Sequence, residues 1–361
     1  MTEVLRAAQV TAPGTIELVP LEDPGLPGPG QLAVELIACG ICGSNLHHLN
    51  RPDLIGADRR DKPGALGHEM SGRVVAVGPD VETHAVGDLV ALEPQLAAAC
   101  GHCDGCATGS SWFCTDPRTL AVWGFADRLV VRAAGAWRLP AGMDPLVATL
   151  MEATGVSVHA LRVTHLCRQR GDDLSGVRVV VLGAGATGLL AVAAARHLGA
   201  TDVVCVARHP HQATLAQRMG ASEVLRDDDA DLEATLTAGR PDLVVECVGG
   251  RATTFDLAAR IVGPRGEISV LGLFDEPQQV DGRSLFRREA RVVFPVVYGE
   301  LDGRHDYDIA ADILATPGLP VDEIITHRFP LADVRGAFAT AGSKGSGVVR
   351  VVVGRTDADL T

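Results

Sequence analysis

The chain has 361 residues and a formal net charge of −13, and both values narrow its range of functions. Its length exceeds what a single hydrophobic core usually fills, so we expect two domains. Hydrophobic residues make up 47% of the chain and charged residues 21%, which is typical of a folded protein and excludes a disordered one. The acidic balance argues against nucleic acid and membrane as partners and leaves a small molecule as the expected partner.

The N-terminus and the cysteines indicate a compartment. Residues 1–6 lack the basic segment and apolar core of a secretory signal. Four of the nine cysteines lie between positions 100 and 114, and this clustering favours metal binding over disulfides. We therefore expect a cytoplasmic protein. The longest apolar run, 179–195, contains three glycines and changes from β-branched to helix-forming residues, which predicts a strand, a turn and a helix instead of a membrane span.

The first part of the chain has the pattern of short strands. Residues 31–38 alternate between polar and apolar types, as a half-buried strand does. Residues 71–78 and 87–92 predict two further strands, and proline and glycine separate these segments. We expect a mostly β domain in this region.

A candidate catalytic metal site follows the first of these strands. Cys42, His68 and Glu152 offer a thiolate, an imidazole and a carboxylate from separate segments, and Glu69 is a fourth candidate. Zinc takes this combination of ligands where one coordination position stays open for substrate. We expect a catalytic zinc here, with either Glu69 or Glu152 as its carboxylate ligand.

Two polar side chains close to Cys42 suit a proton relay. Ser44 has a hydroxyl that donates and accepts at once, and the His47 imidazole titrates near neutral pH. We expect both to be catalytic. His48 is the competing candidate for the role of His47.

A second metal site is predicted by four cysteines with the spacing C-x2-C-x2-C-x7-C. They are Cys100, Cys103, Cys106 and Cys114. Four thiolates form a closed tetrahedral shell without an open position, which is typical of a structural zinc. Free or redox-active thiols and an iron–sulfur cluster are the alternatives.

The second part of the chain predicts a dinucleotide site. A buried strand, 177–182, runs directly into a G-x-G-x-x-G turn, and an alanine-rich helix follows to residue 197. Such glycines permit a tight turn and close approach to a pyrophosphate at the helix N-terminus. The expected cofactor-binding residues in this turn are Gly183, Gly185, Ala186, Thr187 and Gly188.

The end of the next strand indicates which nicotinamide cofactor binds. An acidic residue there would bind the ribose 2′-hydroxyl of NAD, but the chain has Ala207 followed by Arg208 and His211. Asp202 lies at the opposite end of the strand and cannot take that role. Because a guanidinium binds a 2′-phosphate well, we expect NADP(H) over NAD(H), with Ala207, Arg208 and His211 at the site.

Strand and helix patterns alternate through the rest of this region. Residues 242–248, 266–272 and 291–297 read as strands of a doubly wound parallel sheet. The acidic run at 227–231 is interpreted as a solvated turn. Short strands return near the C-terminus, at 347–353.

These motifs together resemble the zinc-dependent medium-chain dehydrogenase/reductase (alcohol dehydrogenase-like) superfamily, and its polyol and threonine dehydrogenase branch in particular. The motifs that carry the resemblance are residues 39–47, 67–69, 71–78, 86–90, 93–94, 124–126 and 152–159. The resemblance implies an α/β fold with a Rossmann domain at 157–297. It also implies a GroES-like catalytic domain formed by 1–156 and 298–361, an active site between the domains, and a homodimer or homotetramer.

The resemblance also implies an activity. It is the interconversion of a secondary alcohol or polyol, such as a sugar alcohol or cyclitol, and its ketone by hydride transfer, with two zinc ions per chain and NADP(H). The alternatives are an aldehyde or ketone reductase, a zinc-free quinone or enoyl reductase on the same fold, and a non-catalytic protein that binds through its zinc lobe.

Two positions depart from the family pattern. Asn45 stands where an Asp usually lies behind the metal-binding imidazole, and a neutral amide would leave that imidazole less basic. Trp123 stands where glycine is common. We expect Trp123 and Phe125 to line the substrate pocket, with plain packing as the alternative.

Overall fold

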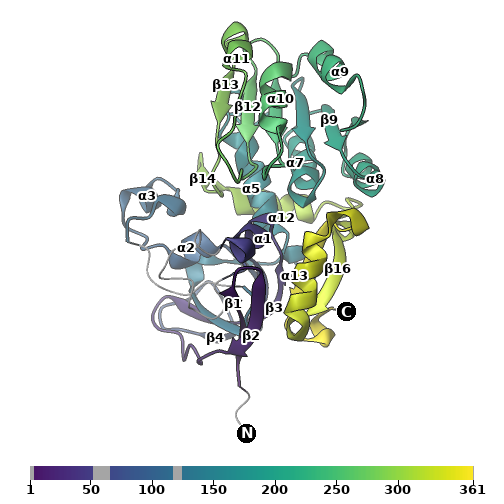
Figure 1. Cartoon of the computed structure of the whole chain (residues 1–361). Coiled ribbons are helices and arrows are strands. Elements are labelled where there is room, and N and C mark those ends of the chain that lie inside the picture. The colour runs from purple at the N-terminus through teal and green to yellow at the C-terminus, as the bar shows by residue number, and fades with distance from the viewer. Residues whose placement is uncertain (1–3, 52–65, 117–123, 361) are drawn as a thin grey trace. The chain divides into compact units, whose positions relative to one another are not determined.

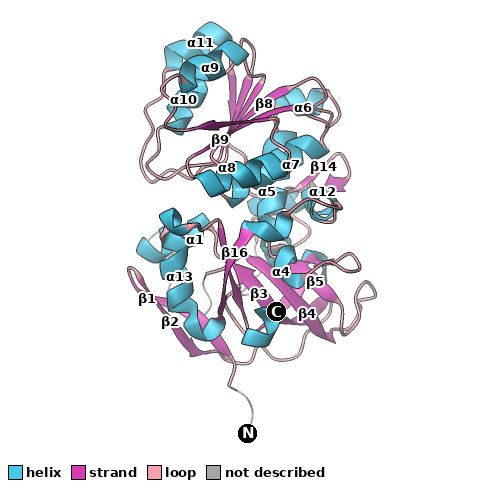
Figure 2. Ribbon diagram, turned by 90° about the vertical axis from the view of Figure 1, so that its right-hand side faces the viewer, coloured by secondary structure: helices cyan, strands magenta, loops and turns pink. Residues whose placement is uncertain are grey.

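The computed structural model describes residues 4–51, 66–116 and 124–360, and it divides the chain into two compact units (Figure 1). Unit 1 combines Met1–Glu152 with Ile325–Thr361, and unit 2 is Ala153–Ile324. Unit 1 is mostly β, and unit 2 contains a parallel sheet flanked by helices (Figure 2). The predicted α/β fold class is confirmed.

The boundary at the end of unit 2 lies further along the chain than the expected position 298. The reason is the packing of helix α12 (Asp306–Leu314) on unit 2. Asp306 forms a buried ion pair with Arg162 at 2.7 Å, and the Tyr307 ring lies against Gly155, where a Cβ would come within 3.0 Å of it. These contacts hold the segment before residue 325 in unit 2.

Unit 1 is built on a mixed sheet with a separate two-stranded hairpin. Within the described residues the sheet has seven strands in the order β16-β17-β3-β4-β5-β7, with β6 paired to β3. The strands of unit 1 are β1 (Arg6–Ala12), β2 (Thr15–Pro20), β3 (Gln31–Gly40), β4 (Glu69–Val77), β5 (Leu89–Leu92), β6 (Arg128–Arg132), β7 (Ala136–Arg138), β16 (Ile325–Pro330) and β17 (Arg350–Gly354).

Short helices connect these strands. They are α1 (Gly43–Asn50), α2 (Pro94–Ala98), α3 (Asp104–Ala107), α4 (Pro145–Ala148) and α13 (Val334–Gly342), with 3-10 turns η2 (Ser111–Phe113), η3 (Ala133–Gly135), η5 (Leu331–Asp333), η6 (Lys344–Ser346) and η7 (Asp357–Leu360). Helix α5 (Met151–Arg162) begins at the end of unit 1 and continues into unit 2.

The strand β3 is more buried than its alternating sequence predicted. It pairs with β4, β6 and β17, so neighbouring strands cover it along both edges and seven of its ten residues are buried. The core beside it joins segments that are distant in sequence. Phe338 of α13 packs edge-on against Phe125 with ring centroids 5.3 Å apart, which fastens the C-terminal segment to the N-terminal one.

Unit 2 contains six parallel strands in the order β10-β9-β8-β11-β12-β13, and all of its residues are described. The strand order reverses beside β8, which makes the carboxyl ends of β8 and β11 the point where such sheets bind ligands. The strands are β8 (Arg178–Leu182), β9 (Asp202–Ala207), β10 (Glu223–Arg226), β11 (Leu243–Glu246), β12 (Glu267–Val270) and β13 (Arg291–Val293).

Helices flank this sheet. They are α6 (His165–Gln169), α7 (Ala186–His197), α8 (Pro210–Arg218), α9 (Leu232–Gly239), α10 (Thr254–Ile261), α11 (Gly282–Arg288) and α12, with the hairpin β14 (Glu300–Leu301) and β15 (Arg304–His305) and the turn η4 (Val321–Ile324). Strand β11 is buried at every position and β9 at all but its first, as in parallel sheets covered on both faces. This confirms the predicted doubly wound parallel sheet. Among the described helices, none has both the length and the apolar character that crossing a bilayer requires.

Candidate functional site

The pairing of β3 with β4 brings the expected catalytic ligands together. In this antiparallel register Gly40 lies opposite Glu69, so Cys42, just after β3, meets His68, just before β4. Ligand atoms of Cys42, His68 and Glu69 all lie within 4.8 Å of one another. A side chain at Gly40 would collide with the Glu69 carboxylate, so the glycine makes this approach possible. We call these three residues the catalytic cluster.

Glu69 is fully buried and is held by an arginine from the C-terminal segment. Its Oε1 accepts a hydrogen bond from Arg350 Nη1 at 2.8 Å, and the same nitrogen donates to the carbonyl of Ile41 at 2.9 Å. Its Oε2 has no hydrogen-bond partner among the described residues. Burial raises the pKa of Glu69 to about 7, against the opposing effect of Arg350. A buried oxygen without a partner beside a thiol and an imidazole fits a bound cation.

Glu152 lies in the first turn of α5, outside this group of three but close enough to interact with it. Burial raises the pKa of Glu152 to about 8, while His68 lowers it and Glu69 raises it. The structure therefore brings three of the four expected ligands within ligand distance of one another and places the fourth within electrostatic reach.

A further buried carboxyl group, Glu93, was missed by the sequence analysis. It caps the N-terminus of α2, and its Oε1 has no hydrogen-bond partner among the described residues. Burial raises the pKa of Glu93 to about 8, and Glu152 contributes to the increase. The following Pro94 signals a helix start at Glu93, but nothing in the local sequence indicates that Glu152 lies near it.

Helix α1 carries the expected proton relay. Ser44, His47 and His48 all lie on this helix, where residues three and four apart share a face. Burial lowers the pKa of His48, and His68 and then His47 lower it further. The pKa of His48 therefore reflects the nearby His68 imidazole. Both histidines remain candidates for the second step of the relay.

Asn45 occupies a different place from the one that the family pattern suggested. Its Oδ1 accepts a hydrogen bond from the backbone N–H of Cys42 at 3.0 Å, because Cys42 caps α1 and Asn45 is the third residue of that helix. No hydrogen bond joins Asn45 to His68 in the described part of the chain. Asn45 is 1% exposed, and its buried amide stabilises the loop that carries Cys42 through this hydrogen bond.

Of the two residues expected to line the substrate pocket, the structure describes Phe125, which lies in the core of unit 1. Phe125 is 1% exposed and packs against Phe338 in the core of unit 1. This placement favours packing over contact with a substrate. Trp123 lies outside the described residues.

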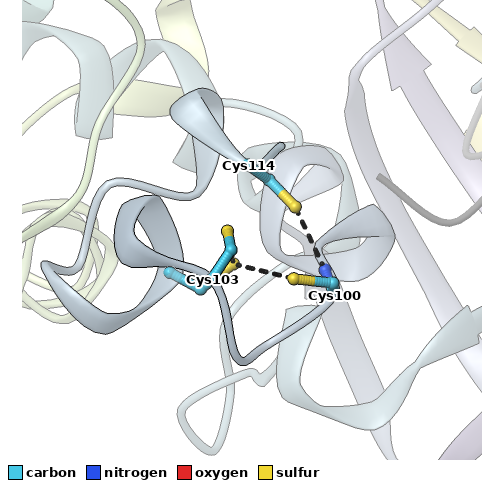
Figure 3. Close-up of side chains that lie close together, drawn as sticks. Cys100, Cys103 and Cys114 are labelled. Atoms are coloured by element: carbon cyan, nitrogen blue, oxygen red, sulfur yellow. Dashed lines mark hydrogen bonds between the residues drawn. The ribbon is translucent and has the colours of Figure 1, made fainter. Parts of the chain in front are cut away.

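The four clustered cysteines, which we call the cysteine lobe (residues 100–114), lie close together. Figure 3 shows three of them, Cys100, Cys103 and Cys114, around a common centre. The four sulfurs lie within 4.8 Å of one another, with 3.6 Å between Cys103 and Cys106 and 3.9 Å between Cys100 and Cys106. The backbone N–H of Cys100 donates to Cys114 Sγ at 3.3 Å. All nine cysteines lie in the described ranges, and each is a free thiol. The arrangement fits one tetrahedral metal ion.

Backbone N–H groups prepare part of the lobe for a cation. The N–H of His102 lowers the pKa of Cys100, and the N–H groups of Cys106 and Thr115 lower the pKa of Cys103 to about 5. Burial raises the pKa of Cys106 to about 11. The N–H groups thus favour the thiolate forms of Cys100 and Cys103, and cation binding would require Cys106 to lose its proton.

The three glycines of the dinucleotide turn have distinct roles. Gly183 has φ +101°, a conformation that L side chains rarely adopt. Gly185 has open space where a Cβ would stand, so a ligand can approach its backbone. A Cβ on Gly188 would collide with the Gly183 carbonyl, which allows α7 to pack closely on β8. Ala186 and Thr187 form the first turn of α7, whose free N–H groups suit a pyrophosphate.

The basic group expected for NADP(H) lies at the carboxyl end of β9. Ala207 is fully buried there, and Arg208 follows with a side chain that is 70% exposed. His209 and His211 stack with ring centroids 5.5 Å apart at the start of α8. Arg208 Nε donates to Asp227 Oδ2 at 2.6 Å. The sequence analysis missed Asp227, because only the pairing of β10 with β9 brings it beside Arg208.

Comparisons with known proteins agree with both halves of this arrangement. The family model of the alcohol dehydrogenase GroES-like domain matches residues 28–141, and that of the zinc-binding dehydrogenase matches residues 186–316. The L-threonine 3-dehydrogenase of Saccharopolyspora erythraea is 33% identical over 344 residues, which cover 93% of this chain and 96% of the relative. The L-threonine 3-dehydrogenase of Pyrococcus abyssi is 31% identical over 339 residues, covering 91% and 92%.

A solved structure shows the same fold. It is described as that of a candidate zinc-binding dehydrogenase from Sinorhizobium meliloti 1021 bound to NADP. Its sequence is 27% identical, the TM-score is 0.82, and the match covers 98% of this chain and 100% of that one. Family models, relatives and structure agree over nearly the whole length. The chain belongs to the zinc-dependent medium-chain dehydrogenase/reductase superfamily.

Proposed function

We propose that this oxidoreductase is a zinc-dependent, NADP(H)-linked dehydrogenase that interconverts a secondary alcohol or polyol and its ketone by hydride transfer. One observation carries the proposal. Ligand atoms of Cys42, His68 and Glu69 lie within 4.8 Å of one another, beside a buried carboxylate oxygen that has no hydrogen-bond partner in the described residues. This donor set suits a zinc ion that keeps a position open. Glu152 is the alternative or additional carboxylate ligand.

When bound, zinc supplies Lewis-acid chemistry to the substrate oxygen. The protein provides the proton path. The Ser44 hydroxyl accepts the alcohol proton and donates its own to an imidazole one helical turn further along α1, at His47 or at His48. Arg350 keeps the Glu69 carboxylate in place from the opposite side, at 2.8 Å. Zinc in the cysteine lobe has a structural role, because its shell of four thiolates is closed.

The choice of NADP(H) rests on the end of β9. The last residue of β9 is Ala207 and not an acidic residue. Arg208, directly after it, presents an exposed guanidinium. Asp202 is occupied at the other end of the strand, where it pairs with Arg178 at 2.7 Å. The NADP-bound relative from Sinorhizobium meliloti supports the same choice.

The substrate class combines a secondary hydroxyl with further polar groups. The buried carboxyls around the cluster support a polyhydroxylated substrate such as a sugar alcohol or a cyclitol. The threonine dehydrogenase relatives add L-threonine, which is itself a secondary alcohol, to the candidates. The nine free thiols support a reducing compartment, the cytoplasm. Exposed apolar side chains on unit 2, such as Phe286 at 82% and Phe294 at 63%, support a homodimer or homotetramer.

The test combines metal analysis with a substrate screen. We expect two zinc ions per chain. In a panel of polyols, simple secondary alcohols and L-threonine, we expect some compounds to be oxidised, and to be oxidised faster with NADP⁺ than with NAD⁺. A zinc-free quinone or enoyl reductase instead binds a single ion per chain, in the cysteine lobe, and reduces an activated alkene. A non-catalytic protein oxidises no NADPH with any aldehyde or ketone.

A further inference from the structure

The acidic run at 227–231, interpreted from sequence as a solvated turn, has a more specific arrangement in the structure. Asp228 forms an ion pair with Arg226 at 3.5 Å, and Asp229 accepts a hydrogen bond from the Arg226 backbone at 3.0 Å. Asp227 accepts a hydrogen bond from Arg208, which directly follows the neighbouring strand β9. One carboxylate of this turn is therefore singled out by its contact.

Strand pairing fixes this contact. In the parallel register of β9 and β10, Ala207 lies opposite Arg226, so the residues that follow them leave the sheet side by side. The backbone N–H of Asp227 also donates to the Ala207 carbonyl at 3.2 Å. The carboxyl ends of strands are where open α/β sheets bind their ligands. Arg208 and Asp227 thus lie at the carboxyl ends of the strands, where such sheets bind dinucleotides.

The atoms that form the contact leave the binding edge of the guanidinium open. Asp227 accepts from Nε, and the two Nη groups have no other partner among the described residues. These two groups are the fork that grips a phosphate with two parallel hydrogen bonds. Asp227 is 30% exposed and Arg208 70%, so the carboxylate lies deeper than the cation that it holds. An arginine side chain fixed in this way loses less conformational freedom when a ligand binds.

We propose that Asp227 sets the preference for NADP(H) over NAD(H) by holding Arg208 so that its open Nη edge faces the ribose 2′-phosphate. This inference rests on the proposed function and deepens it. Asp227 is a positioning residue, because it acts on the cofactor through Arg208. An acidic residue directly after β10 then favours NADP(H), although an acidic residue at the end of β9 would favour NAD(H).

The test compares Asp227→Asn with Asp228→Asn, which removes the same charge one residue further on without touching Arg208. Binding of adenosine 2′,5′-bisphosphate and of 5′-AMP is measured by calorimetry, because the difference between them reports on the 2′-phosphate alone. KM and kcat are then measured with NADP⁺ and NAD⁺. We expect Asp227→Asn to weaken the bisphosphate and to raise the KM of NADP⁺ about fivefold, with kcat and the values for 5′-AMP and NAD⁺ unchanged.

Two further variants separate positioning from a structural effect. Asp227→Glu keeps the carboxylate and is expected to restore part of the preference. In an Arg208→Ala background, Asp227→Asn is expected to change nothing further, since its effect passes through the guanidinium. Tighter binding of the bisphosphate to Asp227→Asn would overturn the inference, because the carboxylate would then repel the phosphate. Unchanged binding would overturn it as well. A wild-type enzyme that prefers NAD⁺ would contradict the proposed function, whereas the bisphosphate measurement still decides the role of Asp227.

Discussion

The cysteine lobe and the catalytic cluster have ligands that suit the same ion, but the chain assembles them differently. The lobe takes its four ligands from fifteen consecutive residues, 100–114, and local N–H groups lower the pKa of Cys103 to about 5. The catalytic cluster takes its ligands from two strand ends, and burial raises the pKa of Glu69 to about 7. The comparison indicates that backbone N–H groups favour the ionised form of Cys103 in the lobe, whereas burial opposes the ionised form of Glu69 in the catalytic cluster.

The largest difference between the two sites should appear in catalysis, when a ligand of the catalytic cluster is removed. Cys42→Ala or His68→Ala removes a ligand from the catalytic cluster but leaves the lobe intact. Turnover should fall by at least about 10³-fold, because the metal lowers the barrier by several kcal/mol. Metal analysis should find one zinc per chain in place of two, and NADPH binding should be unchanged. Full activity in both variants would refute the zinc mechanism.

The second effect is on stability, and it comes from the lobe. Cys103→Ser removes one ligand from the closed shell, and we expect the free energy of unfolding to drop by about 3 kcal/mol or more, because metal-binding energy there is folding energy. Denaturant unfolding and zinc content measure the change. Cys205→Ser is the matched control, since this buried thiol lies far from any metal cluster in the sequence. Equal zinc content in Cys103→Ser and wild type would contradict a role in the shell.

A pH titration sharpens the comparison further. Burial raises the pKa of Glu69 to about 7 and those of Glu93 and Glu152 to about 8, from 4.5 in an unfolded chain. The folded state then binds more protons than the unfolded state. The contribution of these groups to stability is complete below pH 4.5 and is lost as pH rises through 8. Metal-free protein should therefore lose roughly 2–4 kcal/mol between about pH 5 and pH 9.

Zinc should counteract this loss, since a cation favours the ionised carboxylates. We expect the increase in Tm on adding zinc to be larger at about pH 8.5 than at about pH 5.5. Glu93→Gln should flatten the pH dependence of the metal-free protein, whereas the exposed Glu82→Gln should leave it unchanged. A metal-free protein that becomes more stable as pH rises over this range would show that the carboxyls are ionised when buried.

The smallest expected effect concerns the support beneath Cys42. Asn45→Ala leaves the backbone N–H of Cys42 without its acceptor, and we expect a loss of about 1 kcal/mol in stability. Asn50→Ala is the control on the same helix, where the exposed amide donates to the Leu46 carbonyl at 2.9 Å. Zinc affinity at the catalytic cluster should fall in Asn45→Ala and not in Asn50→Ala. Equal zinc affinities would show that the loop keeps its shape without this hydrogen bond.

Sequence reasoning succeeded where the cause of a structure is local. The glycine turn after β8 and the doubly wound sheet follow from spacing and from strand and helix patterns within short segments. It was incomplete where the cause is tertiary. The proximity of Glu93 to Glu152, the contact of Arg208 with Asp227 and the core position of Phe125 depend on which strands pair and which faces are covered. Asn45 was placed by family pattern, and the helix cap explains its actual contact.

The ion pair between Arg350 and Glu69 has a consequence for the order of assembly. Its partners are 281 residues apart, and Arg350 belongs to β17, which pairs with β3. Until residue 350 has left the ribosome, Glu69 has no Arg350 with which to pair. The lobe at 100–114 needs no such late segment. Under the proposed function we therefore expect the cysteine lobe to be able to bind its ion early in synthesis, and the catalytic cluster to be complete only when the chain is nearly finished.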